Sequence, residues 1–303
     1  MRPKTLWLLA MALVPTAWAQ PYRVVDATGK EVVVSSTQRI VSLDGITTEI
    51  LFAVGVGNQV VGRDDSSYYP PEVLRRPSVG YQFRLSAEGI LSLRPTLVIG
   101  REDVRPPQVV EQLRAAGVTV VLVPTEPTVQ GAKAKIRVVA QAVGRQVRGE
   151  ELVRSLERDL LALEAFKAQR APKGRLRALF LYMRGPQTLF VCGEGATPVG
   201  MMVLAGLENA ARGIRECQPM TAESVVASQP DVLVTFKRGL DSIGGLPGLL
   251  RLPGIAQTPA GQKGKVVAMD DLYLGSFGPR AGKAALDLFR AAYLQEGFVE
   301  VVP

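Results

Sequence analysis

The amino-acid sequence predicts an α/β protein of two similar α/β lobes with mostly parallel sheets, joined by one long rigid helix, with a ligand cleft between the lobes. Three observations predict this fold: an internal repeat, apolar strand patterns that follow short helices, and one long amphipathic stretch in mid-chain. The predicted boundaries are a signal peptide over 1–19, an N-terminal lobe over 20–126, a helical linker over 127–171 and a C-terminal lobe over 172–303.

The repeat is carried by one segment in each half of the chain. SAEGILSLRPTLVI spans 86–99 and TAESVVASQPDVLV spans 221–234. Each begins with a capping Ser or Thr followed by Glu, continues as a short helix, and reaches a proline that ends the helix. The apolar run after each proline has the length and β-branching of a parallel-sheet strand. A second match lies upstream, IVSLDG at 40–45 with LFVCGEG at 189–195, and two matches in the same order favour two similar lobes.

The stretch between the repeats predicts the connecting helix. Leucines recur at helical spacing from about Val147 to Gln169, with Arg and Glu on the other face. A helix of roughly 23 residues would be about 35 Å long, and Pro172 and Gly174 would end it. Lobes joined in this way should hinge little. A ligand would lie between them, beyond the carboxyl ends of the strands.

The first residues have the pattern of an export signal. Arg2 and Lys4 precede a short apolar run from Leu6 to Val14, and Ala17-Trp18-Ala19 forms a small-x-small cleavage site. That run is too short to cross a hydrocarbon core about 30 Å thick. We therefore expect a periplasmic protein that is cleaved near Ala19 and, with no cysteine at that site, carries no lipid there.

Composition excludes several classes of function. The formal charge is +8, but no basic run with interleaved aromatics is present, so nucleic acid is not an expected partner. The dispersed arginines are either solvated surface or holders of a carboxylate-bearing ligand. The chain has no histidine, so Ser-His and Cys-His pairs cannot form, and nothing in the sequence indicates an enzyme.

The two cysteines, Cys192 and Cys217, are 25 positions apart. In an oxidising compartment they could bridge, which would add roughly 3 kcal/mol of stability. The alternative is two separate buried thiols, and the sequence does not decide between them.

One tyrosine stands out in a chain that lacks imidazole. Tyr81 follows Gly80 in a loop just before the first repeat helix. A tyrosine held on a tight loop is a good ligand for ferric iron, including heme iron. The alternative is a half-buried loop tyrosine whose hydroxyl caps a backbone group.

Six segments of the chain resemble the periplasmic heme-binding proteins of bacterial heme ABC importers, within the helix-linked class III of substrate-binding proteins. The resemblance covers nearly all of the mature chain. The segments are TEILFAVG (48–55), VGYQFRLSAEGILSLRP (79–95), YMRGPQTLFVCGEG (182–195), LAGLENA (204–210), LPGIAQTPAG (252–261) and MDDLYLGSFGPR (269–280).

For Tyr81 the resemblance implies axial ligation of ferric heme through its phenolate, making it the metal ligand of the site. Many relatives carry Arg two residues after this tyrosine, where it can hydrogen-bond the phenolate oxygen. This chain has Phe83 there and Arg84 next. Either Arg84 takes over that role from a shifted backbone, or Phe83 packs on the porphyrin face instead.

On the second lobe, Tyr182-Met183-Arg184-Gly185 resembles a Y-x-R-G segment of the same family. Tyr182 would ligate the opposite face of the iron, ligate a second stacked heme, or lie against the ring. Because charge-assisted bonds to carboxylates suit arginine, the candidates for holding the heme propionates are Arg184, Lys237, Arg238 and Arg280.

Glu88 and Glu223 occupy matching places in the two repeats. They are either helix N-terminal carboxylates that favour the macrodipole or, as the resemblance implies, the docking residues for a two-fold ABC transporter permease in the inner membrane. The sequence thus predicts a monomeric heme carrier for such a transporter. The rival hypotheses are the same fold carrying cobalamin or a ferric siderophore, and a secreted enzyme on a two-lobe scaffold.

Overall fold

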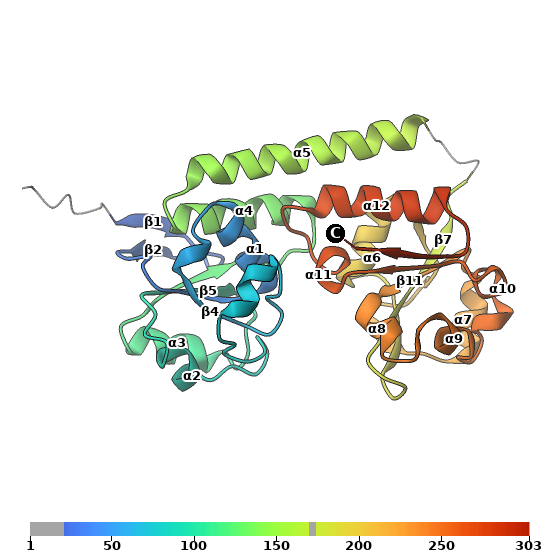
Figure 1. Ribbon diagram of the computed structural model, residues 1–303, viewed down its shortest axis with the longest axis horizontal. Coiled ribbons are helices and arrows are strands. Elements are labelled where there is room, and N and C mark those ends of the chain that lie inside the picture. The colour runs from blue at the N-terminus through green and yellow to red at the C-terminus, as the bar shows by residue number, and fades with distance from the viewer. Residues whose placement is uncertain (1–20, 170–173, 303) are drawn as a thin grey trace, which may run out of the picture.

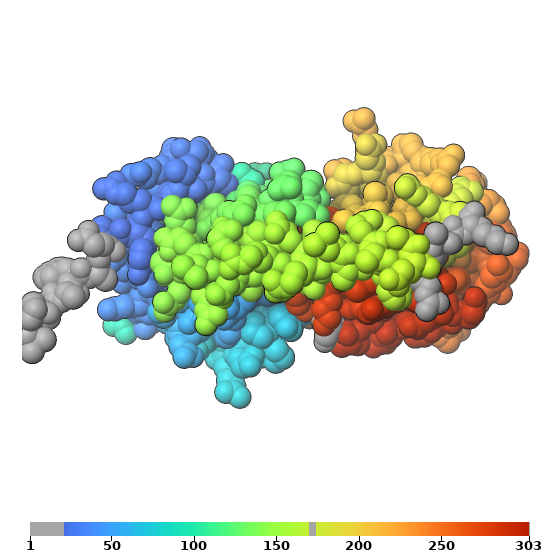
Figure 2. Space-filling model, turned by 90° about the horizontal axis from the view of Figure 1, so that it is seen from above, coloured from blue at the N-terminus to red at the C-terminus, as the bar shows by residue number. Residues whose placement is uncertain are grey.

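The computed structural model describes residues 21–169 and 174–302. Two α/β lobes lie side by side, and the long helix α5 (Gln146–Gln169) runs across both of them (Figures 1 and 2). This helix begins one residue before the predicted start and ends at the predicted residue. The export signal predicted for 1–19 lies outside the described residues. Within the described ranges, no helix has both the length and the apolar character needed to cross a membrane.

The N-terminal lobe is built on a four-stranded parallel sheet in the order β4-β3-β5-β6. Its strands are β3 (Ile40–Leu43), β4 (Val60–Arg63), β5 (Leu97–Arg101) and β6 (Thr119–Val123). A separate antiparallel pair precedes it, β1 (Tyr22–Val25) and β2 (Glu31–Val34). The helices are α1 (Gly45–Ala53), α2 (Ala87–Leu91), α3 (Gln108–Ala115) and α4 (Val129–Ala142), with short 3₁₀ turns at Gly57–Gln59 and Pro71–Arg75.

Both faces of this sheet are buried, which explains its nearly continuous apolar strands. Alternate residues of β5 point to opposite faces, so Leu97 and Ile99 pack with α1 and α4, whereas Val98 packs with α2 and α3. Helix α4 therefore belongs to the packing of the N-terminal lobe, and the part of the predicted linker that crosses between the lobes is α5 (Figure 1).

The C-terminal lobe has a larger mixed sheet in the order β10-β8-β7-β11-β12-β13, with β9 paired to β7. Its strands are β7 (Arg177–Met183), β8 (Leu189–Cys192), β9 (Glu208–Asn209), β10 (Cys217–Pro219), β11 (Val232–Phe236), β12 (Val266–Met269) and β13 (Phe298–Val301). Its helices are α6 (Thr197–Leu204), α7 (Ala222–Ser228), α8 (Lys237–Asp241), α9 (Gly245–Leu250), α10 (Pro259–Lys263), α11 (Asp271–Leu274) and α12 (Ala281–Leu294), with a 3₁₀ turn at Ile255–Gln257.

The downstream repeat is present in both lobes as a capped helix followed by a central strand. Ser86 caps α2 through Gly89 N, and Thr221 caps α7 through Ser224 N; the strands that follow are β5 and β11. The upstream match is not equivalent in the two sheets. Strand β3 is parallel to β5, but β8 is the antiparallel partner of β7, and β7 takes the place beside β11. An apolar strand pattern does not encode strand direction. The direction of β8 is set by the tight turn that contains Gly185 and joins β7 to β8.

The cysteine pair is a disulfide: Cys192 and Cys217 lie opposite each other on β8 and β10 and are bonded. Of the two alternatives open from the sequence, the bridge is the one found.

The two lobes share one core. A single apolar cluster includes Ile46 of the first lobe, Leu156 and Leu163 of α5, and Phe277 of the second. Gly278 permits this close approach, since a Cβ there would lie 2.8 Å from Ile46 Cδ1. Packing of this density favours a fixed arrangement of the lobes over wide hinge motion.

Candidate functional site

A cavity of about 390 Å³ opens between the lobes, within the size range of small-molecule sites. Its walls follow the carboxyl ends of strands β4, β7, β11 and β12, where ligands of open α/β sheets bind. The lining residues are Asp65, Ser66, Tyr68, Tyr81, Tyr182, Arg184, Phe236, Arg238, Asp271, Leu272, Gly275 and Ser276. We call this cavity the cleft pocket.

Tyr81 lies on the N-terminal wall of the cleft pocket. Gly80, at φ +97°, turns the chain into this loop, a conformation that favours glycine. The tyrosine remains 45% exposed, and among the described residues its hydroxyl has no hydrogen-bond partner. Burial raises the pKa of Tyr81, with Tyr182 and Asp64 adding to that effect and Arg101 and Arg184 opposing it. The phenol is therefore protonated at neutral pH unless a bound cation displaces the proton.

Tyr182 meets Tyr81 from the opposite wall. It lies on β7, half-buried, with its ring edge towards Phe236 at 6.2 Å between centroids. The guanidinium of Arg184 lies 5.1 Å from the Tyr182 ring centroid. The structure thus brings the two predicted tyrosines to one cavity.

The residues after Tyr81 take different positions. Phe83 is partly exposed and packs edge-on against Tyr81, with 5.3 Å between ring centroids. Arg84 is exposed and does not line the cleft pocket; only its backbone N–H contacts Tyr81, donating to the carbonyl oxygen at 2.7 Å.

Arg101 is a cation near Tyr81 that the sequence reasoning missed. Its guanidinium lies 5.8 Å from the Phe83 ring centroid and is held by two 2.7 Å hydrogen bonds to Asp103. Arg101 is the last residue of β5, at the same sheet edge as Tyr81. A charged residue at the end of a buried apolar run is the sequence feature that could have identified it.

Two of the four predicted propionate candidates line the cleft pocket. Arg184 donates to Asp271 at 2.7 Å, and Arg238 lies 4.1 Å above the ring of Tyr68. Lys237 instead pairs with Asp241 and Glu300 at the surface.

Arg280, the fourth candidate, lies outside the cleft pocket. It donates twice to Glu49 of α1, at 2.8 Å each, and its guanidinium lies 3.6 Å above the ring of Tyr69. This pair lines a different cavity of about 440 Å³ between α1, α5 and the start of α12. Arg280 is thus an inter-lobe contact.

Tyr68, also missed from the sequence, spans the cleft. Its hydroxyl accepts a hydrogen bond from Leu272 N at 2.7 Å and donates towards Asp270 at 3.2 Å. Burial, with Asp270 adding, raises the pKa of Tyr68 and keeps this phenol protonated. Its hydroxyl joins the two lobes and is fully engaged, unlike that of Tyr81.

Glu88 and Glu223 are exposed in the first turns of α2 and α7. Both helices lie on the side of the molecule away from α5 (Figure 1). The two carboxylates are therefore available to a partner, one on each lobe.

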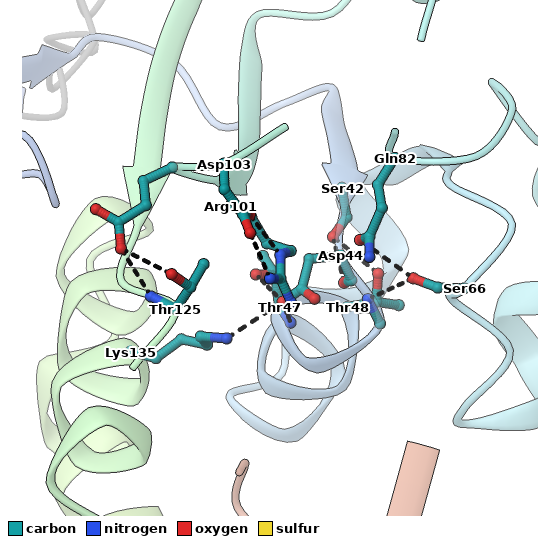
Figure 3. A network of polar contacts seen from close by, with 12 residues as sticks. Ser42, Asp44, Thr47, Thr48, Ser66, Gln82, Arg101, Asp103, Thr125 and Lys135 are labelled. Carbon is teal, nitrogen blue, oxygen red and sulfur yellow. Dashed lines mark hydrogen bonds and ion pairs between the residues drawn. The ribbon is translucent and has the colours of Figure 1, made fainter. Parts of the chain in front are cut away.

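Beneath the Tyr81 loop, polar side chains form a network at the carboxyl edge of the first sheet (Figure 3). Thr48 contacts Ser42 at 2.8 Å and Ser67 at 2.7 Å, and Ser67 in turn donates to Asp64. Burial raises the pKa of Asp64 to about 6, although the hydroxyls of Ser66 and Ser67 oppose that shift.

The Asp64 carboxyl is expected to make stability depend on pH. Because its folded pKa lies above the unfolded value of 3.8, its contribution is full below about pH 4 and is lost as the pH rises through about 6. We expect the free energy of unfolding of the wild type to rise by about 2.5 kcal/mol between pH 7.5 and pH 4 relative to that of Asp64→Asn. Urea unfolding at a series of pH values measures this, and superimposable pH profiles for the two proteins would contradict it.

Two solved structures resemble this chain closely. The periplasmic heme-binding protein RhuT from Roseiflexus sp. RS-1, in its apo form, is 47% identical with a TM-score of 0.82, covering 85% of this chain and 98% of that one. The periplasmic heme-binding protein BhuT, in complex with two hemes, is 36% identical with a TM-score of 0.80, covering 84% of this chain and 97% of that one.

Curated relatives are more distant. An uncharacterised ABC transporter substrate-binding lipoprotein of Bacillus subtilis is 28% identical, covering 71% of this chain and 69% of that protein. The vitamin B12-binding protein of Vibrio parahaemolyticus is 26% identical, covering 68% of this chain and 74% of that protein. A family model described as periplasmic binding protein matches residues 40–273, most of the chain.

Proposed function

The chain belongs to the periplasmic binding protein family, and we propose that it binds ferric heme in the cleft pocket through the phenolate of Tyr81 and delivers it to an ABC importer. It is a substrate-binding protein of a transport system and not an enzyme. The observation that carries the proposal is the Tyr81 hydroxyl, exposed to the cleft pocket and without a hydrogen bond among the described residues. The heme-binding proteins of the same fold, at 47% and 36% identity, support heme as the ligand.

The chemistry of the pocket suits a ferric porphyrin. A hard anionic oxygen favours ferric over ferrous iron, and the bound cation would displace the phenol proton. Aromatic rings of Phe83, Tyr182 and Phe236 give apolar surface for the macrocycle, while Arg184 and Arg238 supply charge for its carboxylates. We propose that Tyr182 contacts the opposite face of the iron, a second stacked heme, or the ring.

A hemin titration of the mature protein tests the proposal. Binding should produce a Soret band and a high-spin ferric tyrosinate spectrum in EPR, at one or two hemes per chain. No absorbance change on adding hemin would refute it.

The second candidate ligand is cobalamin, because curated vitamin B12-binding proteins are among the relatives. Cobalamin needs no tyrosinate, so its binding would not depend on the Tyr81 hydroxyl. Competition between hemin and cobalamin for the same protein separates the two.

The location and partner form part of the same proposal. The family and the lipoprotein relative support an extracytoplasmic protein. We propose that it is a monomer cleaved near Ala19, and that Glu88 and Glu223 dock one lobe on each half of the permease dimer.

Docking through Glu88 and Glu223 predicts a selective transport defect. Glu88→Gln and Glu223→Gln should each lower heme uptake through the cognate importer by roughly tenfold, since exposed charges at an interface mainly set encounter rate and orientation. Hemin affinity should stay unchanged. Glu164→Gln, an exposed glutamate on α5 at the far side of the molecule, is the control. Uptake that is unaffected in the double variant would contradict the docking role.

A further inference from the structure

We propose that a small polar chamber beside the cleft pocket receives one carboxylate of the bound heme, with Lys135 as its main cationic partner. This inference rests on the proposed function. The chamber has a volume of about 50 Å³ and shares Gly275 and Ser276 with the cleft pocket. It can hold a group the size of one or two waters, such as a carboxylate, but no ring.

Lys135 provides the first observation. It extends from α4 into the chamber and is only 6% exposed (Figure 3). Its Nζ lies 3.7 Å from Asp44 Oδ2, an ionic contact, and it makes no hydrogen bond to any residue within the described ranges. An ammonium has three donors, and none of those of Lys135 is taken by a residue in the described ranges. Its Nζ is not among the fully buried unpaired atoms, so water entering the chamber can reach it. A ligand carboxylate could replace that water and accept from Lys135 directly.

Asp44 does not fill this need. It is the N-cap of α1, and its Oδ2 already accepts from Thr47 N and Thr47 Oγ1, each at 2.9 Å. Although burial opposes ionisation, Lys135, Arg101 and Thr47 hold the pKa of Asp44 below its usual value. Asp44 thus remains one negative charge facing two cations.

Arg101 and Lys135 differ in how their carboxylate neighbours engage them. Asp103 accepts two 2.7 Å hydrogen bonds from Arg101, whereas Asp44 lies 3.7 Å from Lys135 Nζ, too far for a hydrogen bond. Lys135 is therefore the chamber cation that still has donors for a ligand carboxylate.

The second lobe presents donors from the other side. Thr197, the first residue of α6, lines the chamber, so the positive end of this helix dipole lies beside it. Thr197 and Ser276, each of which carries a hydroxyl, line the same space. A carboxylate here would therefore contact both lobes at once.

The experiment compares hemin with hemin dimethyl ester, in which both carboxylates are blocked. Wild-type protein should bind hemin at least about tenfold more tightly than the ester, because bonds between charged partners are the strong ones. Lys135→Met should lose most of that preference, because its affinity for hemin should fall while its affinity for the ester stays unchanged. Lys133→Met is the control, since Lys133 lies on the same helix but pairs with Glu157 at 2.7 Å.

Thr197→Val provides an independent variant, because it removes a chamber hydroxyl from the other lobe without touching the Lys135–Asp44 contact. It should also reduce the preference for hemin, by severalfold. If the variants bind hemin and the ester with equally reduced affinity, the inference is wrong. It is also wrong if both variants keep the full preference for hemin. If the wild type binds hemin through Tyr81 but binds the dimethyl ester equally well, this inference alone is wrong. If the wild type does not bind hemin at all, the proposed function itself is refuted.

Discussion

Tyr81→Phe is expected to lower hemin affinity by more than about a hundredfold and to remove the tyrosinate features from the optical and EPR spectra. Loss of a residue that merely supports a metal ligand commonly costs 10–100-fold, so loss of the ligand oxygen should cost more. The fold should be unaffected. Phenylalanine keeps the ring that packs against Phe83, and the hydroxyl that it removes makes no hydrogen bond within the described residues.

Tyr68→Phe is the matched control for that substitution. Tyr68 lines the same cavity, but its hydroxyl is already engaged by Leu272 N and Asp270. Its removal should change stability and leave the iron spectrum as it is. If Tyr68→Phe abolished the tyrosinate signature and Tyr81→Phe preserved it, the ligand assignment would be wrong.

Tyr182→Phe then distinguishes the roles open to the facing tyrosine. If Tyr182 binds the opposite face of the same iron, the variant should change the coordination state while keeping one tyrosinate. If it binds a second heme, the stoichiometry should fall from two to one. An unchanged spectrum and stoichiometry would mean that Tyr182 only lies against the ring.

The sequence was sufficient for the parts of the fold that depend on local patterns. Helical leucine spacing located α5 to within one residue, and the capped-helix repeat located α2 with β5 and α7 with β11. It was insufficient for the direction of β8, because a short apolar run reads alike in parallel and antiparallel pairs.

The candidate site was predictable where a sequence motif contains the residue, as the glycine loop before the first repeat helix does for Tyr81 and the Y-x-R-G segment does for Tyr182. It was not predictable where a role depends on long-range packing. Lys135 reads as an ordinary charge on an amphipathic helix, and only the fold shows that it is buried between the lobes. The same applies to Arg280, since its partner Glu49 is 231 positions away in the chain.

The buried Glu49–Arg280 pair yields the second large expected effect: Arg280→Met should destabilise the protein by about 3–5 kcal/mol, the usual cost of leaving one partner of a buried ion pair uncompensated. The Glu49 side chain is 5% exposed and that of Arg280 is 17% exposed. Burial, opposed by Arg280, already raises the pKa of Glu49, so without Arg280 the carboxyl should protonate or draw in water. Urea unfolding measures the loss.

The matched control is Arg148→Met, which breaks the exposed Arg148–Glu151 pair on α5 and should cost less than about 1 kcal/mol. The double variant Glu49→Leu with Arg280→Met should recover much of the stability, because a pair of apolar residues leaves no buried charge. An Arg280→Met protein as stable as the control variant would contradict the argument.

The same substitution separates two roles for Arg280 in ligand binding. The pair joins α1 of one lobe to the start of α12 in the other, so its loss should loosen the lobes and speed hemin release. Release of hemin and of its dimethyl ester should accelerate equally, because the guanidinium lies outside the cleft pocket. If only hemin release accelerated in stopped-flow transfer to a heme acceptor, Arg280 would be a direct partner of the carboxylates and the inter-lobe role would be wrong.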